Sequence, residues 1–91
     1  MQLRWTVDAV SDLAAIKDYI EADKPEAARK TASRILAQAE SLLPHPAKGR
    51  LGRVLNTRES VISDLPYIII YRVKDDQLEI LRVLHTSRKY P

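Results

Sequence analysis

Apolar residues in the first half of the chain recur at intervals of three and four positions, the spacing that places them on one face of a helix. The two runs are Ala9, Leu13, Ile16 and Ile20, and then Ala28, Ala32, Ile35, Ala39 and Leu42. Between them, DKPE (23–26) ends the first run and starts the second, since proline is tolerated in the first turn of a helix. Thr6 or Asp8 can accept from the free N–H groups at the start of the first helix. We therefore expect a hairpin of two amphipathic helices.

From Val54 onward the period of the pattern changes to two and β-branched residues become more frequent, which is typical of strands. The predicted strands lie at 2–5, 56–62, 67–73 and 77–84, with turns at SDLP (63–66) and KDDQ (74–77). The order β-α-α-β-β-β predicts a two-layer α+β fold in which the helical hairpin packs on a small, mostly antiparallel sheet. Because a chain of 91 residues supports one core, we expect residues 1–91 to form a single domain.

Two of these strands are apolar on both faces instead of alternating. They read YIIIYRV (67–73) and LEILRVL (78–84). Two helices can cover only one face of the sheet, and a large bare apolar face is unusual in a monomer. Either the C-terminal tail closes the second face, or a partner covers it.

The composition excludes several kinds of site. The chain has no cysteine, and its two histidines, His45 and His85, lie in different segments without ligand-like spacing, so we expect no metal and no cofactor. No apolar run approaches the ~20 residues of a membrane helix, and the N-terminus lacks the pattern of a signal peptide. We expect a soluble, cytoplasmic protein without a membrane partner.

Positive charge is concentrated in the second half of the chain. The net charge is +3; residues 1–43 hold six Lys/Arg against seven Asp/Glu, and residues 44–91 hold nine against five. Such an excess attracts nucleic acid or an acidic protein through long-range steering. A simply solvated basic face remains an equal alternative.

The segment PHPAKGRLGRVLNTR (44–58) carries no acidic residue. Its basic residues are Lys48, Arg50, Arg53 and Arg58. Gly49 and Gly52 permit a positive φ, so this loop can present several cations in a tight turn. Either the loop contacts DNA phosphates or an acidic protein groove, or its glycines only make the bend between helix and sheet.

Several short motifs occur in a fixed order. They are W-x3-A-x2-DL with I-x2-YI (5–20), P-x2-GRxGRV within 44–54, TRE (57–59), PYIIIYRV (66–73) and ILRVLH (80–85). Together they resemble the RelE/ParE superfamily of type II toxins, and the likeness covers nearly the whole chain. In this resemblance Trp5, Leu13, Ile16 and Ile20 belong to the fold.

The resemblance implies a growth-arresting toxin of a type II toxin–antitoxin system, of the kind also called plasmid stabilisation proteins. It implies that a cognate antitoxin wraps the toxin with a helix and a strand and holds it inactive, and that the pair binds operator DNA through the antitoxin. The family contains two chemistries. RelE-like members are ribosome-dependent endoribonucleases that cut mRNA, and ParE-like members poison DNA gyrase without hydrolysis of their own.

The residues match a nuclease only in part. RNA cleavage needs a base, an acid and cations for the developing phosphorane charge. His85, Arg88 and Tyr90 supply candidates, with Arg58 as a further cation. RelE-like nucleases carry an arginine three residues before the tyrosine that matches Tyr71, but here that position is Ile68, which cannot hold a phosphate.

We therefore expect a ParE-like toxin that inhibits DNA gyrase. Whether the chain is an enzyme stays open, since a ParE-like gyrase poison is not one and a RelE-like chain is an endoribonuclease. The expected target-binding residues are Lys48, Arg50, Arg53, Arg58, Arg82, His85, Arg88, Lys89 and Tyr90. Within the fold, Arg82 is expected to pair with Glu59 or Glu79, and Arg58 to bond to the C-terminal segment. The first alternative is a RelE-like endoribonuclease acting on the ribosome and mRNA, and the second is an inactive toxin that retains only antitoxin and operator binding.

Overall fold

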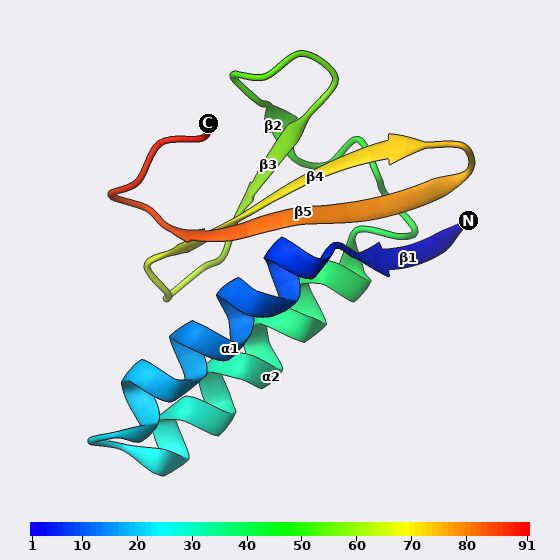
Figure 1. The fold of residues 1–91 in the computed structure, drawn as a ribbon. Helices are drawn as coiled ribbons and strands as arrows, with labels where there is room; N and C mark the ends of the chain where they lie inside the picture. The colour runs from blue at the N-terminus through cyan, green and yellow to red at the C-terminus, as the bar shows by residue number, and fades with distance from the viewer.

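The computed structural model describes all residues, 1–91, and contains two helices and five strands (Figure 1). In chain order these are β1 (Gln2–Trp5), α1 (Val7–Glu21), α2 (Pro25–Ser41), β2 (Arg50–Leu51), β3 (Arg58–Val61), β4 (Tyr67–Lys74) and β5 (Gln77–His85). Neither helix has the length and apolar character needed to cross a membrane.

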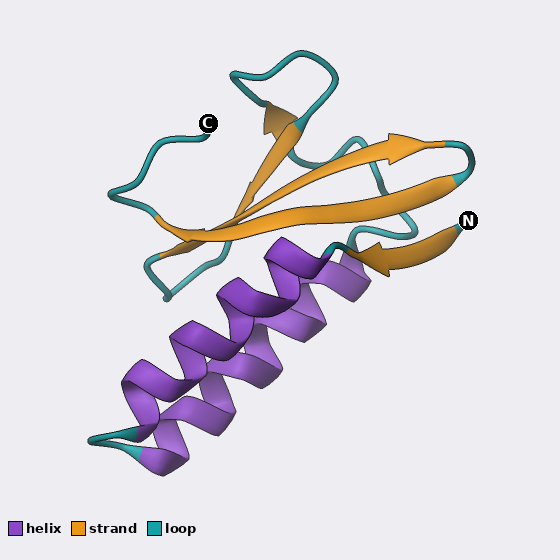
Figure 2. Cartoon of the chain, viewed as in Figure 1, coloured by secondary structure: helices purple, strands orange, loops and turns teal.

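The strands form one mixed sheet in the order β1-β5-β4-β3-β2. β1 is parallel to β5, and the other neighbours are antiparallel. Both helices lie on one side of this sheet (Figure 2), so the predicted two-layer α+β fold is confirmed. The predicted order lacked β2, where Arg50 and Leu51 pair with Glu59 and Arg58. Two residues are too short for a pattern of period two to reveal.

Each helix begins where the sequence indicates. Of the two expected caps, Thr6 is the one used: its Oγ1 accepts from the Ala9 N–H at 3.1 Å and donates to the Leu81 carbonyl at 2.9 Å. The cap therefore also ties the start of α1 to β5. Pro25 occupies the first turn of α2, where its missing N–H costs nothing.

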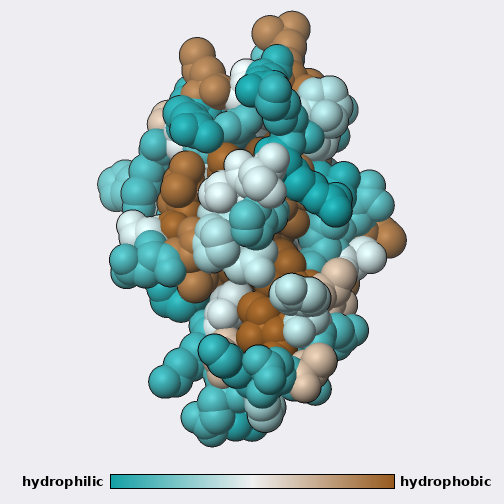
Figure 3. All heavy atoms as spheres, turned by 90° about the vertical axis from the view of Figure 1, so that its left-hand side faces the viewer, coloured by the Kyte–Doolittle hydropathy of each residue, from teal (hydrophilic) through white to brown (hydrophobic).

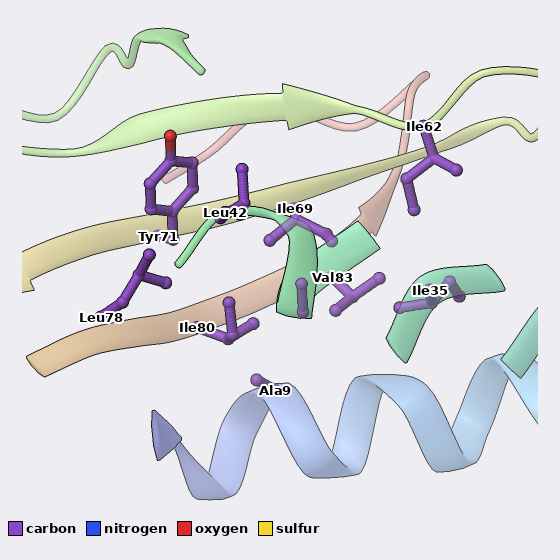
Figure 4. Packing of buried hydrophobic residues seen from close by; sticks show 10 residues of the cluster. Ala9, Ile35, Leu42, Ile62, Ile69, Tyr71, Leu78, Ile80 and Val83 are labelled. Atoms are coloured by element: carbon purple, nitrogen blue, oxygen red, sulfur yellow. The ribbon is translucent and has the colours of Figure 1, made fainter. Parts of the chain in front are cut away.

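The main core lies between the helices and the sheet (Figure 4). Its buried members are Ala9, Ile35, Ala39, Leu42, Ile62, Ile69, Tyr71, Leu78, Ile80 and Val83. Trp5, Leu13 and Ile16 pack against this cluster, as expected for residues of the fold. The far half of the hairpin extends past the sheet (Figure 1), and Ile20 there is only half-buried.

Tyr71 joins the core to the loop that follows α2. Its ring is fully buried, and its hydroxyl points away from the helices (Figure 4). That hydroxyl donates to the Pro46 carbonyl at 2.8 Å and accepts from the Gly49 N–H at 2.9 Å. A single core side chain thus fixes the start of the basic loop.

The two glycines of this loop are required because neighbouring atoms leave no room for a side chain. The prediction that they adopt a positive φ is therefore wrong. No glycine has a positive φ. A Cβ on Gly49 would lie 2.6 Å from the Tyr71 hydroxyl, and one on Gly52 would collide with Thr57 Oγ1. The residues with positive φ are Asn56, Asp64, Asp75 and Asp76. The last two close the predicted β4–β5 turn, as in a type I′ hairpin.

The second face of the sheet carries a small apolar cluster of Ile68, Ile70 and Leu84. Leu81 and Tyr90 pack against it. Of the two expected ways to cover this face, closure by the chain's own tail is therefore realised at this cluster.

Glu79 is the one buried carboxylate and lies between two arginines. It accepts from Arg72 Nε at 2.8 Å and from Arg4 Nη1 at 3.4 Å. The hydrogen bond from Arg72 is the largest cause that lowers the pKa of Glu79 below its ordinary value, and it outweighs the opposing effect of burial. A carboxyl with a lowered folded-state pKa stabilises the fold above its ordinary pKa, and this contribution is lost as the pH falls through the lowered value.

We accordingly expect the free energy of unfolding to fall from about pH 5 downward, and more steeply for the wild type than for a Glu79→Gln variant. The glutamine keeps the shape of the side chain but does not titrate. Urea unfolding between neutral and acidic pH measures the difference. Parallel pH profiles of the two proteins would contradict the role of Glu79.

Candidate functional site

The C-terminal tail (86–91) folds back over the face of the sheet that lies away from the helices (Figure 1). Two backbone hydrogen bonds hold its start: the Thr86 N–H donates to the Pro66 carbonyl at 2.8 Å and the Arg88 N–H to the His85 carbonyl at 2.9 Å. After Arg88 the tail is held by packing, since the Tyr90 ring rests on the cluster of Ile68, Ile70 and Leu84.

Between this tail and the basic loop lies a cleft of about 200 Å³, which we call the tail cleft. Its lining residues are Arg50, Arg53, Glu59, Ile68, Ile70, Leu84 and residues 86–90. The structure thus brings together five of the nine residues expected to bind the target, from two segments that are more than thirty positions apart in the sequence. Cations rim the cleft and aliphatic side chains form its floor.

Only part of this positive charge is free. Arg50 Nη2 lies 3.0 Å from a carboxylate oxygen of Glu59, so the charge of that arginine is largely compensated. Arg53, Arg88 and Lys89 are exposed and form no ion pair. These three side chains are the ones available to an anionic ligand.

Arg58 has a structural role, as expected, but with a different partner. Its guanidinium donates to the Gly49 carbonyl at 2.8 Å and to the Ala47 carbonyl at 3.3 Å. The expectation that it bonds to the C-terminal segment is therefore wrong. Arg58 fixes the basic loop on β3 and does not line the tail cleft.

The expected partner of Arg82 is also wrong. Arg82 forms a two-point hydrogen bond to Asp12 of α1, with distances of 2.7 and 2.9 Å, and the Val83 N–H donates to the same carboxylate at 3.0 Å. Glu59 and Glu79 are already engaged by other arginines. The arrangement clamps α1 to the edge of β5, so Arg82 belongs to the fold and not to the cleft.

His85 ends β5 and lines a different hollow of about 600 Å³, which we call the aromatic groove. The groove is lined by Asp12, Ala15, Ile16, Tyr19, Pro66, Tyr67, Val83, Leu84, His85 and Arg88. The His85 and Tyr67 rings meet edge to face with centroids 5.8 Å apart. The His85 Nδ1 atom lies 2.8 Å from Ser87 Oγ and accepts from the Ser87 N–H at 3.1 Å.

The two hollows share Leu84 and Arg88 alone. The residue best suited to proton transfer therefore lies in one hollow, and most of the free cations lie in the other. Lys48 is exposed and lines neither of them.

Burial, with Tyr19 nearby, raises the pKa of Tyr67, so its hydroxyl stays protonated and can donate to a ligand in the aromatic groove.

Sequence reasoning missed the aromatic groove. Tyr19 and Tyr67 belong to two separate motifs, and no local pattern places α1 beside the start of β4. The only signal in the sequence is that each motif contains a tyrosine, whose apolar ring and polar tip suit a partly wet contact surface.

Comparison with known proteins gives consistent results. Residues 3–90 match the family model described as ParE toxin of type II toxin-antitoxin system, parDE. The chain is 44% identical to Y4kP of Sinorhizobium fredii over 99% of this chain and 93% of that protein. It is 41% identical to toxin RelE2 of Caulobacter vibrioides over 96% and 97%. A structure of the chromosomal ParDE system from P. aeruginosa superposes with a TM-score of 0.88 at 32% identity, covering 93% of this chain and 95% of the other.

Proposed function

The chain belongs to the ParE toxin family of type II toxin–antitoxin systems, and from this premise we propose that it arrests growth by poisoning DNA gyrase. The RelE/ParE membership expected from the sequence is thereby confirmed, and so is a cognate antitoxin as partner. The gyrase target, and operator binding through the antitoxin, are the parts that we propose.

The observation that carries the proposal is the floor of the tail cleft. Ile68 stands where a RelE-like nuclease carries an arginine, and it is 8% exposed beneath the Tyr90 ring. An aliphatic floor under three free cations suits contact with a surface better than it suits cleavage. His85, the histidine expected to transfer protons, does not line this cleft.

The nuclease alternative has one observation in its favour: Arg88 borders both hollows and could join His85 to the cations. Against it, His85 Nδ1 is engaged by Ser87 and its ring packs on Tyr67. The His85 Nε2 atom has no partner in the protein, but the ring lies in the aromatic groove, so cleavage of RNA in the tail cleft would require this histidine to turn toward the cleft. The ParE-like function requires no such movement.

In the proposed function the tail cleft contacts the target. Arg53, Arg88 and Lys89 would meet phosphates of gyrase-bound DNA or acidic side chains, and Tyr90 would add an amphipathic surface. Each neutralised phosphate steepens the dependence of binding on salt. No cofactor is required, because the protein holds a complex and does not carry out chemistry.

Replacing His85 by alanine distinguishes the two functions. If His85 only contacts the target or packs, we expect growth arrest on expression to weaken less than about tenfold, as for one residue of an interface. If it transfers protons in RNA cleavage, the loss should be about 10²–10⁴-fold. The dose of inducer needed to halt growth gives the scale, with melting temperature as the control for folding.

Arg53→Ala is the matched variant, since it removes a free cation of the tail cleft and leaves the core untouched. We expect it to weaken growth arrest more than His85→Ala does. A His85→Ala protein that is folded but harmless, beside an active Arg53→Ala protein, would favour the nuclease. If the wild type itself fails to arrest growth, the inactive-toxin alternative holds.

A further inference from the structure

Three aliphatic side chains lie exposed on and beside the β2–β3 loop. Leu51 is 77% exposed, Leu55 is 85% exposed, and Val73 at the end of β4 is 46% exposed. In Figure 3 hydrophobic side chains project from the top of the molecule, where this loop lies in Figure 1. Leucines so far from any core are unfavourable in water and are typical of an interaction site.

These side chains line one hollow of about 580 Å³, which we call the edge patch. Its lining residues are Leu51, Leu55, Asn56, Thr57, Arg58, Arg72, Val73 and Lys74. Three of these are basic and none is acidic. Arg72 is paired with Glu79, so the uncompensated charges of the rim are those of Lys74 and of Arg58, which donates to loop carbonyls and meets no carboxylate. The patch is therefore an apolar surface with two uncompensated cations at its rim.

The edge patch also contains an open strand edge. β3 begins at Arg58, which pairs with Tyr71, so no strand pairs with Arg72, Val73 and Lys74 on that side of β4. No other backbone hydrogen bond reaches these three residues from the loops. Lys74 flanks the two-residue turn and bonds to Gln77 of β5, and Arg72 faces β5 in the same way, so the Val73 N–H and C=O are the backbone groups on the open side that can pair with a further extended chain.

We propose that the edge patch docks an extended, acidic segment of the protein target, which pairs with β4 and places aliphatic side chains against Leu51 and Leu55. The open edge calls for a polypeptide, because a nucleic acid has no backbone that can continue a sheet. The basic rim disfavours a second copy of this chain, which would bring like charges together. This inference rests on the proposed function, since it assumes that the toxin acts on a protein.

The position of the edge patch supports a role in target binding. In β2 and the loop that follows it, Arg50 and Arg53 line the tail cleft, whereas Leu51 and Leu55 line the edge patch. One target could therefore hold the β2–β3 loop from both sides, through charge on one side and apolar contact on the other. Gly52 and Thr57 pack closely at the base of the loop and give it a fixed shape.

The test is the double variant Leu51→Glu/Leu55→Glu, which puts two negative charges where an acidic segment would lie. The matched control is Val7→Glu/Val10→Glu, which adds the same charge at two exposed valines of α1. A second variant, Lys74→Glu, reverses one charge of the rim and leaves both leucines in place. Each protein is purified from its antitoxin, refolded, and checked by melting temperature.

Four readouts are needed: growth arrest on expression, binding to purified gyrase subunits, binding to the cognate antitoxin, and binding to a short DNA duplex. We expect Leu51→Glu/Leu55→Glu to weaken growth arrest and subunit binding at least about tenfold, with Lys74→Glu showing a smaller loss. Antitoxin binding and duplex binding should remain within about threefold of the wild type, as for residues outside an interface. The control should match the wild type throughout.

Other outcomes overturn the inference in distinct ways. Unchanged growth arrest in the folded double variant means that the patch does not serve the target. Selective loss of antitoxin binding assigns the patch to the antitoxin, and selective loss of duplex binding assigns it to DNA. If the wild type does not engage gyrase at all, the proposed function fails, and growth arrest by the variants then decides the inference alone. If the double variant does not fold, Lys74→Glu decides it.

Discussion

Deleting residues 86–91 is expected to abolish growth arrest and to leave the fold and antitoxin binding mostly intact. The deletion removes Arg88, Lys89 and Tyr90, which form one wall of the tail cleft. It also removes two of the three free cations, so both the charge and the shape that a target would meet are lost. The start of the tail is held by two backbone hydrogen bonds and by the Ser87 N–H, which donates to His85 Nδ1, and no core residue lies within it.

The cost in stability should be small. Tyr90 is half-buried on Ile68, Ile70 and Leu84, so its loss exposes a limited apolar area and should lower the free energy of unfolding by about 1–2 kcal/mol. Growth after induction, pull-down with the antitoxin and thermal unfolding check the three parts of the prediction. Tyr90→Phe serves as the control, because it keeps the ring that covers the cluster. A truncated protein that still arrests growth would show that the tail cleft is not the target-binding site.

Tyr71→Phe removes a single oxygen atom. We expect it to lower the free energy of unfolding more than the removal of any other side-chain hydroxyl of this chain. The hydroxyl is buried and bridges the Gly49 N–H and the Pro46 carbonyl. Without it both backbone groups lose a partner, which costs about 1–3 kcal/mol for a buried group. We expect a total of about 2–4 kcal/mol, and hence a fall in melting temperature of about 4–8 °C for each kcal/mol in a domain of this size.

The matched control is Tyr19→Phe, because Tyr19 is 83% exposed and its hydroxyl makes no hydrogen bond within the protein. Its effect should stay within about 0.5 kcal/mol. The Tyr71→Phe protein should also bind its target less tightly, since the loop that carries Arg50 and Arg53 begins at the residues that this hydroxyl holds. Equal melting temperatures of the two variants would mean that the bridge does not stabilise the loop.

The sequence predicts the fold well because the fold depends on local periodicity. Apolar residues at intervals of three and four place Ala9, Ile35, Ala39 and Leu42 on buried helix faces, and all four are fully buried. The run of isoleucines in β4 indicates a strand covered on both faces, and the tail does cover part of the second face. The strand β2 could not be predicted, because two residues are too few to show a periodic pattern.

Contacts between distant segments could not be predicted in the same way. Asp12 and Arg82 are seventy residues apart, and their pairing depends on how α1 lies against β5. The sequence indicates a basic loop, but it does not say that Glu59 neutralises Arg50 or that loop carbonyls engage Arg58. Which cations remain free, and that His85 lies apart from most of them, follows only from the packed structure.

A supercoiling reaction with purified DNA gyrase distinguishes a gyrase poison from an mRNA endoribonuclease. The protein is freed of its antitoxin, refolded and added to gyrase, ATP and relaxed plasmid, and the products are treated with detergent and protease. We predict linear plasmid, trapped when gyrase is held in its cleaved complex, and less of it with Arg53→Ala. Normal supercoiling without linear DNA, by a preparation that still arrests growth in cells, would contradict the account and point to cleavage of mRNA.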